Sequence, residues 1–140
     1  MTVSDPLAAL VAYLASDSEV SALVGTRVFG QELPPGEAQQ MPRPCVVVQA
    51  AGGFGERSDV PVQTLRVDAR CYGRTLHEAM AVHLAVYGAL KKRLRRSQQG
   101  DALLHSAIME GGPRPLRDPD ADWPFVLSSW QLIAADEPLS

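Results

Sequence analysis

Three histidines, His77, His83 and His105, are the side chains best suited to acid–base chemistry or metal binding near neutral pH. A metal-binding pair on a helix needs histidines four residues apart with a carboxylate beside them, and these three offer no such pair. His83 lies on the apolar stripe of a predicted helix. We therefore interpret it as a hydrogen-bonded core histidine rather than as a ligand or a catalytic base.

Alternating aspartates near the C-terminus, Asp118, Asp120 and Asp122, resemble the start of a calcium-binding loop. However, Pro119 follows the first of them, no glycine stands at the sixth position, and no glutamate ends a twelve-residue frame. The segment is therefore predicted to be a solvated acidic loop.

The remaining candidates for chemistry are two cysteines and a group of glycines. Cys45 and Cys71 are too few for a disulfide framework, and no second pair of Cys or His completes a four-ligand zinc site. They are predicted to be buried, reduced thiols of a cytosolic protein. Gly52, Gly53 and Gly55 follow a predicted strand, but no helix begins behind them to bind a phosphate. Because a Gly-x-Ser-x-Gly elbow is also missing, the sequence predicts neither an enzyme nor a cofactor or metal site.

Positive charge gathers in one conspicuous run, residues 91–96. Cations at the C-terminal end of a helix complement its dipole, which explains the run without any partner. The alternative is a basic patch that meets an acidic neighbouring subunit or DNA. The net charge of −3 argues against a protein whose main task is to coat nucleic acid.

The elements that must position these residues begin with a helix capped by Ser4 or Asp5. Its apolar positions recur at helical spacing: Leu7, Leu10, Val11 and Leu14. A second short helix is expected to stop at Gly25, and a brief strand follows at residues 27–29.

Two strands are expected in the middle of the chain. Residues 45–50 are apolar on both faces, which predicts a strand covered on each side. Residues 62–72 alternate, so that one face consists of Leu65, Val67, Ala69 and Cys71. The opposite face consists of Arg66, Asp68, Arg70 and Tyr72. A slip of one residue would bury two arginines, and the register is therefore well specified.

A long helix follows this strand. Thr75 and Glu78 are predicted to form a capping box, and a helix that runs to about Arg96 is roughly 33 Å long. Its predicted apolar stripe consists of Leu76, Met80, His83, Tyr87, Leu90 and Leu94. Further strands are expected over residues 103–110 and 125–134.

Residues 30–43 and 111–122 lack periodicity and are rich in proline. Because such long unstructured connections are uncommon in a compact domain, we expect two irregular arms that contact other subunits. The expected fold is α+β, with an antiparallel sheet of about four to five strands and the long and N-terminal helices packed on one face. Residues 1–140 are expected to form a single domain.

A small domain without a catalytic motif, but with a charged strand face and two arms, is typical of a protein that works through contacts with other copies or neighbours. The candidate subunit interface consists of Arg66, Asp68, Arg70, Tyr72, Arg93, Arg95, Arg96, Arg114, Arg117 and Asp118. No apolar run reaches the ~20 residues that a membrane span needs, and no signal peptide is expected.

Several short motifs stand in an order that points to a function. The first helix leads through Leu23-Val24-Gly25-Thr26-Arg27-Val28-Phe29 to Leu33-Pro34. Pro44 and the run Val46-Val47-Val48-Gln49 come next, and then a strand that ends at Tyr72 before a helix that opens on Thr75 and Glu78. These motifs cover about residues 5–96, with a weaker match around Trp130. In this order they resemble the phage tail-terminator (tail-completion) protein family.

The resemblance implies a structural virion protein that assembles as a ring, usually a hexamer. The ring would cap the tail tube, stop its growth and join it to the head connector or a head-completion protein. Genomic DNA would pass through the lumen without sequence-specific binding, and no membrane is implied. The expected location is the tail–neck junction of the virion, and the host cytoplasm during assembly.

Two alternatives stay open. A head–tail connector (neck or head-completion) protein of the same particle would share the small α+β build, and its position in the particle would separate it. A cytosolic α+β protein that binds a small molecule would need a deep apolar pocket with a few polar groups.

Overall fold

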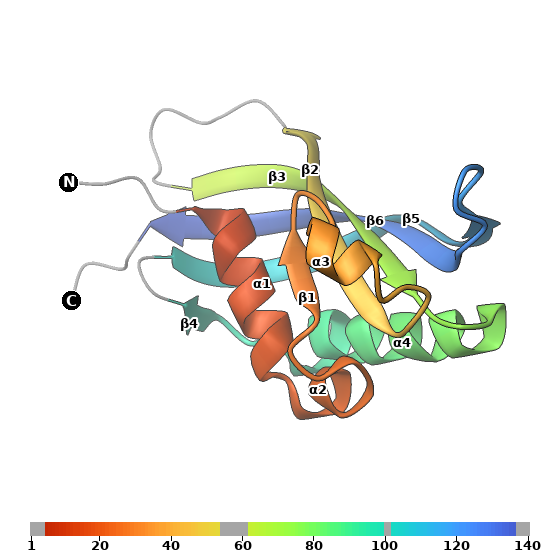
Figure 1. The fold of residues 1–140 in the computed structure, drawn as a ribbon. Coiled ribbons are helices and arrows are strands. Elements are labelled where there is room, and N and C mark those ends of the chain that lie inside the picture. The colour runs from red at the N-terminus through yellow and green to blue at the C-terminus, as the bar shows by residue number, and fades with distance from the viewer. Residues whose placement is uncertain (1–4, 54–61, 100–101, 137–140) are drawn as a thin grey trace.

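The computed structural model describes residues 5–53, 62–99 and 102–136 and has the expected α+β fold (Figure 1). Ser4 and Gly55, for which the sequence suggested a cap and a turn, lie outside these ranges. The strands are β1 (Val28–Gly30), β2 (Cys45–Gly53), β3 (Val62–Tyr72), β4 (Ser97–Gln99), β5 (Ala102–Arg117) and β6 (Pro124–Asp136). The helices are α1 (Pro6–Ser16), α2 (Ser18–Val24), α3 (Pro35–Ala38), α4 (Leu76–Gly88) and the π-helical turn η1 (Ala89–Arg93).

The sheet is larger than expected, and it is mixed rather than purely antiparallel. Its six strands lie in the order β1-β2-β3-β6-β5-β4. β1 runs parallel to β2, whereas the other neighbouring strands are antiparallel. A parallel pair requires a crossover that returns the chain to the same end of the sheet. Residues 31–44, the crossover segment, make this connection and contain α3, so the first arm is not an irregular loop throughout.

The main core lies between one face of the sheet and the helices α1, α2 and α4. Alternate residues of β3 point into it, as the sequence predicted: Val67, Ala69 and Cys71 are buried there, and Leu65 packs against them. Asp5 caps α1, which also agrees with the prediction. The hydroxyl of Tyr13 donates a hydrogen bond to the carbonyl of Ala89 at 2.7 Å, and this bond joins α1 to the end of α4.

The long helix begins as predicted but ends earlier. The Thr75 hydroxyl accepts the N–H of Glu78, and the Glu78 carboxylate accepts the N–H of Arg74, one residue before the position expected in a capping box. At its other end the helix widens into η1, which stops at Arg93 instead of Arg96.

The predicted apolar stripe of this helix is only partly correct. Leu76 is 37 % exposed, and Met80 and Tyr87 are half-buried. The buried positions are Ala79, Val82, His83, Val86, Ala89, Leu90 and Leu94. Small side chains in this set let the helix lie close to the strands, so the helix is turned toward its alanines and valines rather than toward its largest side chains.

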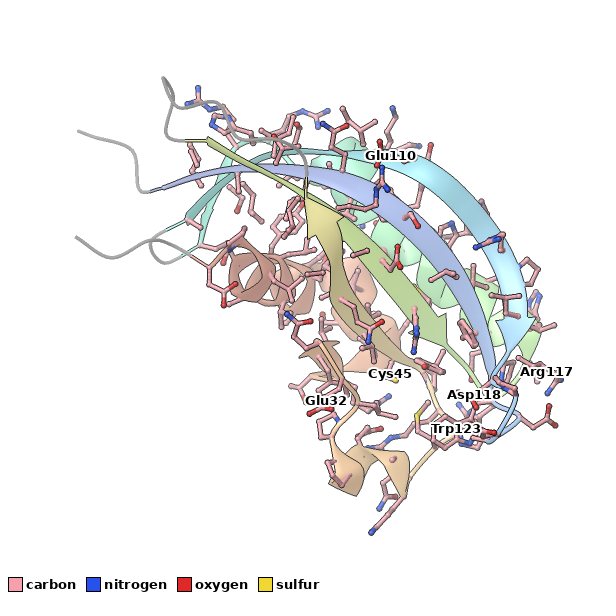
Figure 2. The ribbon with its side chains drawn as sticks, turned by 90° about the horizontal axis from the view of Figure 1, so that it is seen from above. Glu32, Cys45, Glu110, Arg117, Asp118 and Trp123 are labelled. Atoms are coloured by element: carbon pink, nitrogen blue, oxygen red, sulfur yellow. The ribbon has the colours of Figure 1, made fainter. Side chains whose placement is uncertain are left out.

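The second arm is the largest departure from the predictions, because residues 111–122 are mostly strand. β5 continues through them to Arg117 and pairs with β6, and a short turn joins the two (Figure 1). Pro113 and Pro115 cannot donate to a strand ladder. β4 pairs with β5 only at residues 102–104, so in the described structure the outer edge of β5 is unpaired beyond them and tolerates proline. Three register shifts along β5 accompany the curvature of this hairpin (Figure 2).

The opposite face of the sheet, here called the open face, is covered at one end only. A second, smaller apolar cluster lies there and consists of Cys45, Val47, Tyr72 and Phe125. Leu33 and Met41 of the crossover segment pack onto it. Residues 45–48 of β2 are therefore buried on both faces, as the apolar run predicted, whereas Ala50 at the end of the predicted strand is exposed.

No single helix in the described ranges combines the length and the apolar composition needed to cross a membrane. α1 and α2 meet that test only as a pair, and the chain bends by 82° between them.

Candidate assembly surfaces

The strand face predicted from the sequence lies on the open face of the sheet, and two of its charged members have partners within the subunit. Arg66 Nε donates to a carboxylate oxygen of Glu110 on β5 at 3.3 Å, across the intervening strand β6. The carboxylate of Asp68 accepts a hydrogen bond from the hydroxyl of Ser129 at 2.7 Å. The Arg66 side chain is 48 % exposed, so this surface is polar, partly neutralised and open to solvent.

Tyr72 was predicted to share this charged face, but the structure buries it. Its side chain belongs to the second apolar cluster and lies edge-on to Trp123, with 6.3 Å between the ring centroids. Burial raises the pKa of its hydroxyl. Arg70 lies at the border of the cluster, with its guanidinium carbon 5.9 Å from the ring centroid of Phe125. The crossover segment and the hairpin cover this end of the strand, which the local pattern could not indicate.

The three alternating aspartates form an exposed turn at the end of the β5–β6 hairpin, here called the hairpin tip (residues 118–122; Figure 2). The Asp118 carboxylate accepts the backbone N–H groups of Ala121 and Asp120 at 2.8 and 2.9 Å. These two hydrogen bonds hold the pKa of Asp118 below its ordinary value. Arg117 donates to the carbonyl oxygen of Asp122 at 3.1 Å. The aspartates therefore shape a turn, and no cluster of three potential metal ligands occurs among the described residues.

Arg93, another candidate interface residue, is engaged inside the subunit. Its Nε and Nη2 atoms donate to the two carboxylate oxygens of Asp17 at 2.7 and 2.9 Å, and a second ion pair joins it to Glu19. This Arg93 clamp fixes η1 to the junction of α1 and α2. Burial alone would raise the pKa of Asp17, but the hydrogen bonds that it accepts outweigh burial and hold the pKa below its ordinary value. The partners stand 76 positions apart, so no local pattern could reveal the pair.

The other cations of this run are exposed and form the basic end: Lys91, Lys92, Arg95 and Arg96. The helix ends at Arg93. The helix dipole therefore accounts for Lys91 and Lys92 in the last turn, but not for the two arginines beyond it.

A shallow apolar groove beside the basic end was not predicted. It is lined by Glu19, Ala22 and Leu23 of α2 and by Leu84 and Ala85 of α4, and the Glu19 carboxylate pairs with Arg93. Leu23 is 40 % exposed and Leu84 is 60 % exposed. The one feature of the sequence that could have indicated the groove is that Leu84, a large apolar side chain, lies outside the predicted apolar stripe of its helix. We call this feature the α2–α4 groove.

His83 and both cysteines are buried, as the sequence predicted, and their surroundings favour their neutral forms. His83 is 1 % exposed, its Nδ1 atom has no hydrogen-bond partner, and burial lowers its pKa. The hydrogen bond expected for this histidine is thus not found at Nδ1. Burial raises the pKa of the Cys45 thiol to about 12 and also raises that of Cys71. A thiol of this kind is a poor nucleophile.

The candidate interface residues thus fall on three separate surfaces rather than one. Arg66, Asp68 and Arg70 share the open face, Arg114, Arg117 and Asp118 belong to the hairpin, and Arg95 and Arg96 belong to the basic end. The hairpin lies beside the start of α4, because the N–H of Gly73 donates to the carbonyl of Pro124 at 3.4 Å. The basic end lies at the far end of the same helix.

The domain is small and α+β, its cysteines are buried, and its charged residues lie on several surfaces. The family model described as "Tail completion protein gp17" matches residues 8–127. The chain belongs to this family, in agreement with the resemblance of its motifs. It is a structural protein of the phage tail-completion type and a virion component.

Two solved structures are similar to this chain at low sequence identity, and the first of them shares its fold. A chain from the "Virion of native gene transfer agent (GTA) particle" has a TM-score of 0.68 to this chain at 18 % identity, over 92 % of this chain and 93 % of that one. The gp17 protein of bacteriophage SPP1 has a TM-score of 0.49 at 19 % identity, over 89 % of this chain and 85 % of that one. No curated protein matches this chain.

Proposed function

We propose that the protein forms a ring that caps the tail tube of a phage or gene transfer agent particle, stops tube growth and joins the tube to the head connector or a head-completion protein. The observation that carries this proposal is the family match, which extends from α1 into the beginning of β6 and so covers most of the chain. The fold shared with a gene transfer agent virion chain supports it. The ring, usually a hexamer, assembles in the host cytoplasm and lies at the tail–neck junction.

A terminator must end a repeating assembly. A contact that can repeat produces an open filament, and only a unit whose far side accepts no further tube subunit stops it. The outer edge of β5 would suit such a far side, because in the described part of the chain it is unpaired beyond residues 102–104 and Pro113 and Pro115 have no N–H to donate to a further strand. A further strand could not form a complete ladder along that edge.

The open face suits a lumen through which DNA passes without being held. A surface of unpaired cations would bind phosphates tightly by releasing counterions. On the open face Arg66 is paired with Glu110, and Asp68 with Ser129. Such a surface gives DNA little net attraction.

Deletion of the gene in a strain that produces the particles tests the proposal, with the same strain complemented by the intact gene as the control. Electron microscopy should show filled heads without tails, together with free tail tubes of abnormal length. Tails of normal length beside leaking, unsealed heads would identify a head-side connector instead. Normal particles would refute a structural role, and a small molecule retained by a monomeric protein would then favour the binding-protein alternative.

A further inference from the structure

We infer that neighbouring copies in the ring meet head to tail, with the hairpin tip of one copy seated in the α2–α4 groove and against the basic end of the next. This inference rests on the proposed function, because it takes a ring of identical copies as its starting point. It adds the two surfaces that form the contact.

The two surfaces carry opposite charge. The hairpin tip exposes Asp120 and Asp122; the side chain of Asp122 is 81 % exposed but pairs with Arg117 at 3.4 Å, so Asp120 is the more available negative charge of the tip. The basic end exposes the cations Lys91, Lys92, Arg95 and Arg96. A contact of either surface with its own copy would place like charges together. Charge therefore disfavours a two-fold symmetric pairing through these surfaces and favours a contact between unlike ones.

The hairpin and the basic end lie at opposite ends of α4 (Figure 1). The hairpin lies beside the start of α4, and the basic end begins in η1, which finishes at Arg93. The helix between Leu76 and Arg93 separates them by roughly 25 Å at its rise per residue. They therefore cannot meet within one copy, whereas a head-to-tail contact between copies closes into a ring when its rotation allows.

Apolar surface accompanies the charge on both sides. The groove exposes Leu23 and Leu84, and Lys91 follows Leu84 by two turns along the same helix. The hairpin tip exposes Pro119 and Ala121 between its aspartates. An apolar centre with a charged rim is the arrangement found in specific protein interfaces.

Both surfaces are held in place before any contact forms. The Asp118 carboxylate fixes the hairpin tip through the N–H groups of Asp120 and Ala121. The Arg93 clamp fixes α2 against the end of α4, and thus fixes both walls of the groove. Little conformational freedom is lost on binding when both partners are ordered in advance.

Cysteine cross-linking inside assembled particles tests the contact. Particles are made with the variant Asp120→Cys/Lys92→Cys and treated with a short bifunctional maleimide. The native thiols of Cys45 and Cys71 are buried and should not compete. We expect a ladder of cross-linked species that reaches the full ring. Asp120→Cys/Ala12→Cys, which moves one cysteine to an exposed position on α1, should give no ladder.

Three other outcomes would refute the inference, and each identifies a different reason. Particles that contain the double variant but give no ladder would show that the contact is wrong while the tail-completion role stands. Dimers from either single-cysteine variant would show a symmetric contact. A wild-type chain that is absent from purified particles would refute the proposed function itself.

Charge reversal gives an independent readout. Lys91→Glu/Lys92→Glu should reduce incorporation of the protein into particles roughly tenfold, because like charges would then face each other across the contact. Adding Asp120→Lys to the same chain should restore incorporation. Normal incorporation together with loss of packaged DNA would show that the basic end meets DNA instead, and would refute the subunit contact.

Discussion

Replacement of Arg93 by alanine tests whether the Arg93 clamp stabilises the fold. The change removes two hydrogen bonds to Asp17, one to the carbonyl of Ala85 and the ion pair with Glu19. Hydrogen bonds to charged groups contribute roughly 1.5–3 kcal/mol, whereas exposed ion pairs contribute about 1 kcal/mol or less. The side chain of Asp17 is 8 % exposed and that of Arg93 is 34 % exposed. We therefore expect an intermediate loss of about 2 kcal/mol in the free energy of unfolding.

Urea unfolding followed by tryptophan fluorescence measures this loss and its pH dependence. With an m-value of about 2 kcal/mol/M, the midpoint at pH 7 should fall by about 1 M. The pKa of Asp17 is lowered in the folded protein. A carboxyl group of this kind stabilises the fold above its unfolded-state pKa, and the stabilisation is lost as the pH falls through the lower, folded value. The difference between wild type and variant should stay constant from pH 7 to 5 and shrink below about pH 4.

Lys91→Ala is the matched control, because Lys91 lies in the same helical turn and is exposed. Its stability should change by less than about 0.5 kcal/mol. If Arg93→Ala were no less stable than this control, or if its deficit persisted unchanged at low pH, the clamp would not contribute as the structure indicates.

Three further predictions concern other parts of the domain. Arg66→Glu should change the free energy of unfolding by less than about 1 kcal/mol, because its ion pair with Glu110 is exposed; a loss of several kcal/mol would contradict the assignment of its face. Gly73→Ala should lower the melting temperature strongly, because its new Cβ would lie 2.5 Å from a backbone nitrogen of α4. Gly36→Ala, which has nothing within 4 Å, should not, and equal melting temperatures would argue against the close approach. Cys45 and Cys71 should resist a thiol reagent in the folded protein and react in urea, and fast labelling of the native chain would disprove their burial.

Local signals in the sequence predicted α1, α2 and β3, which contribute to the main core. Ser4 and Asp5 were the two predicted caps of α1, and Asp5 is the one that caps it; Gly25, with a φ of +61°, marked the end of α2. The alternation of residues 62–72 predicted β3 with the bounds that the structure shows. These signals depend on neighbours within one helical turn or along one strand, so they can be read without knowledge of the fold.

The predictions fail where a residue type is compatible with two structures and only the tertiary fold decides between them. Pro113 and Pro115 predicted a loop, but proline is compatible with a strand whose donor side is unpaired, and only the strand order puts β5 in that position. The predicted stripe of α4 is wrong at Leu76, Met80 and Tyr87, because the largest side chains of this helix do not all face the core. In the structure Ala79, Val82 and Val86 face the sheet, and Leu84 is left exposed.

The sequence alone determined the α+β class, the register of β3 and the order of motifs that resembles the tail-completion family. Only the tertiary structure decided which charged residues are available to a partner. In the folded chain Arg93 pairs with Asp17, and Tyr72 is buried beside Trp123. The hairpin tip and the basic end lie at opposite ends of α4. The physical reason is distance along the chain. Backbone patterns are set by near neighbours, whereas the exposure and pairing of a charge depend on residues that only the folded chain brings together.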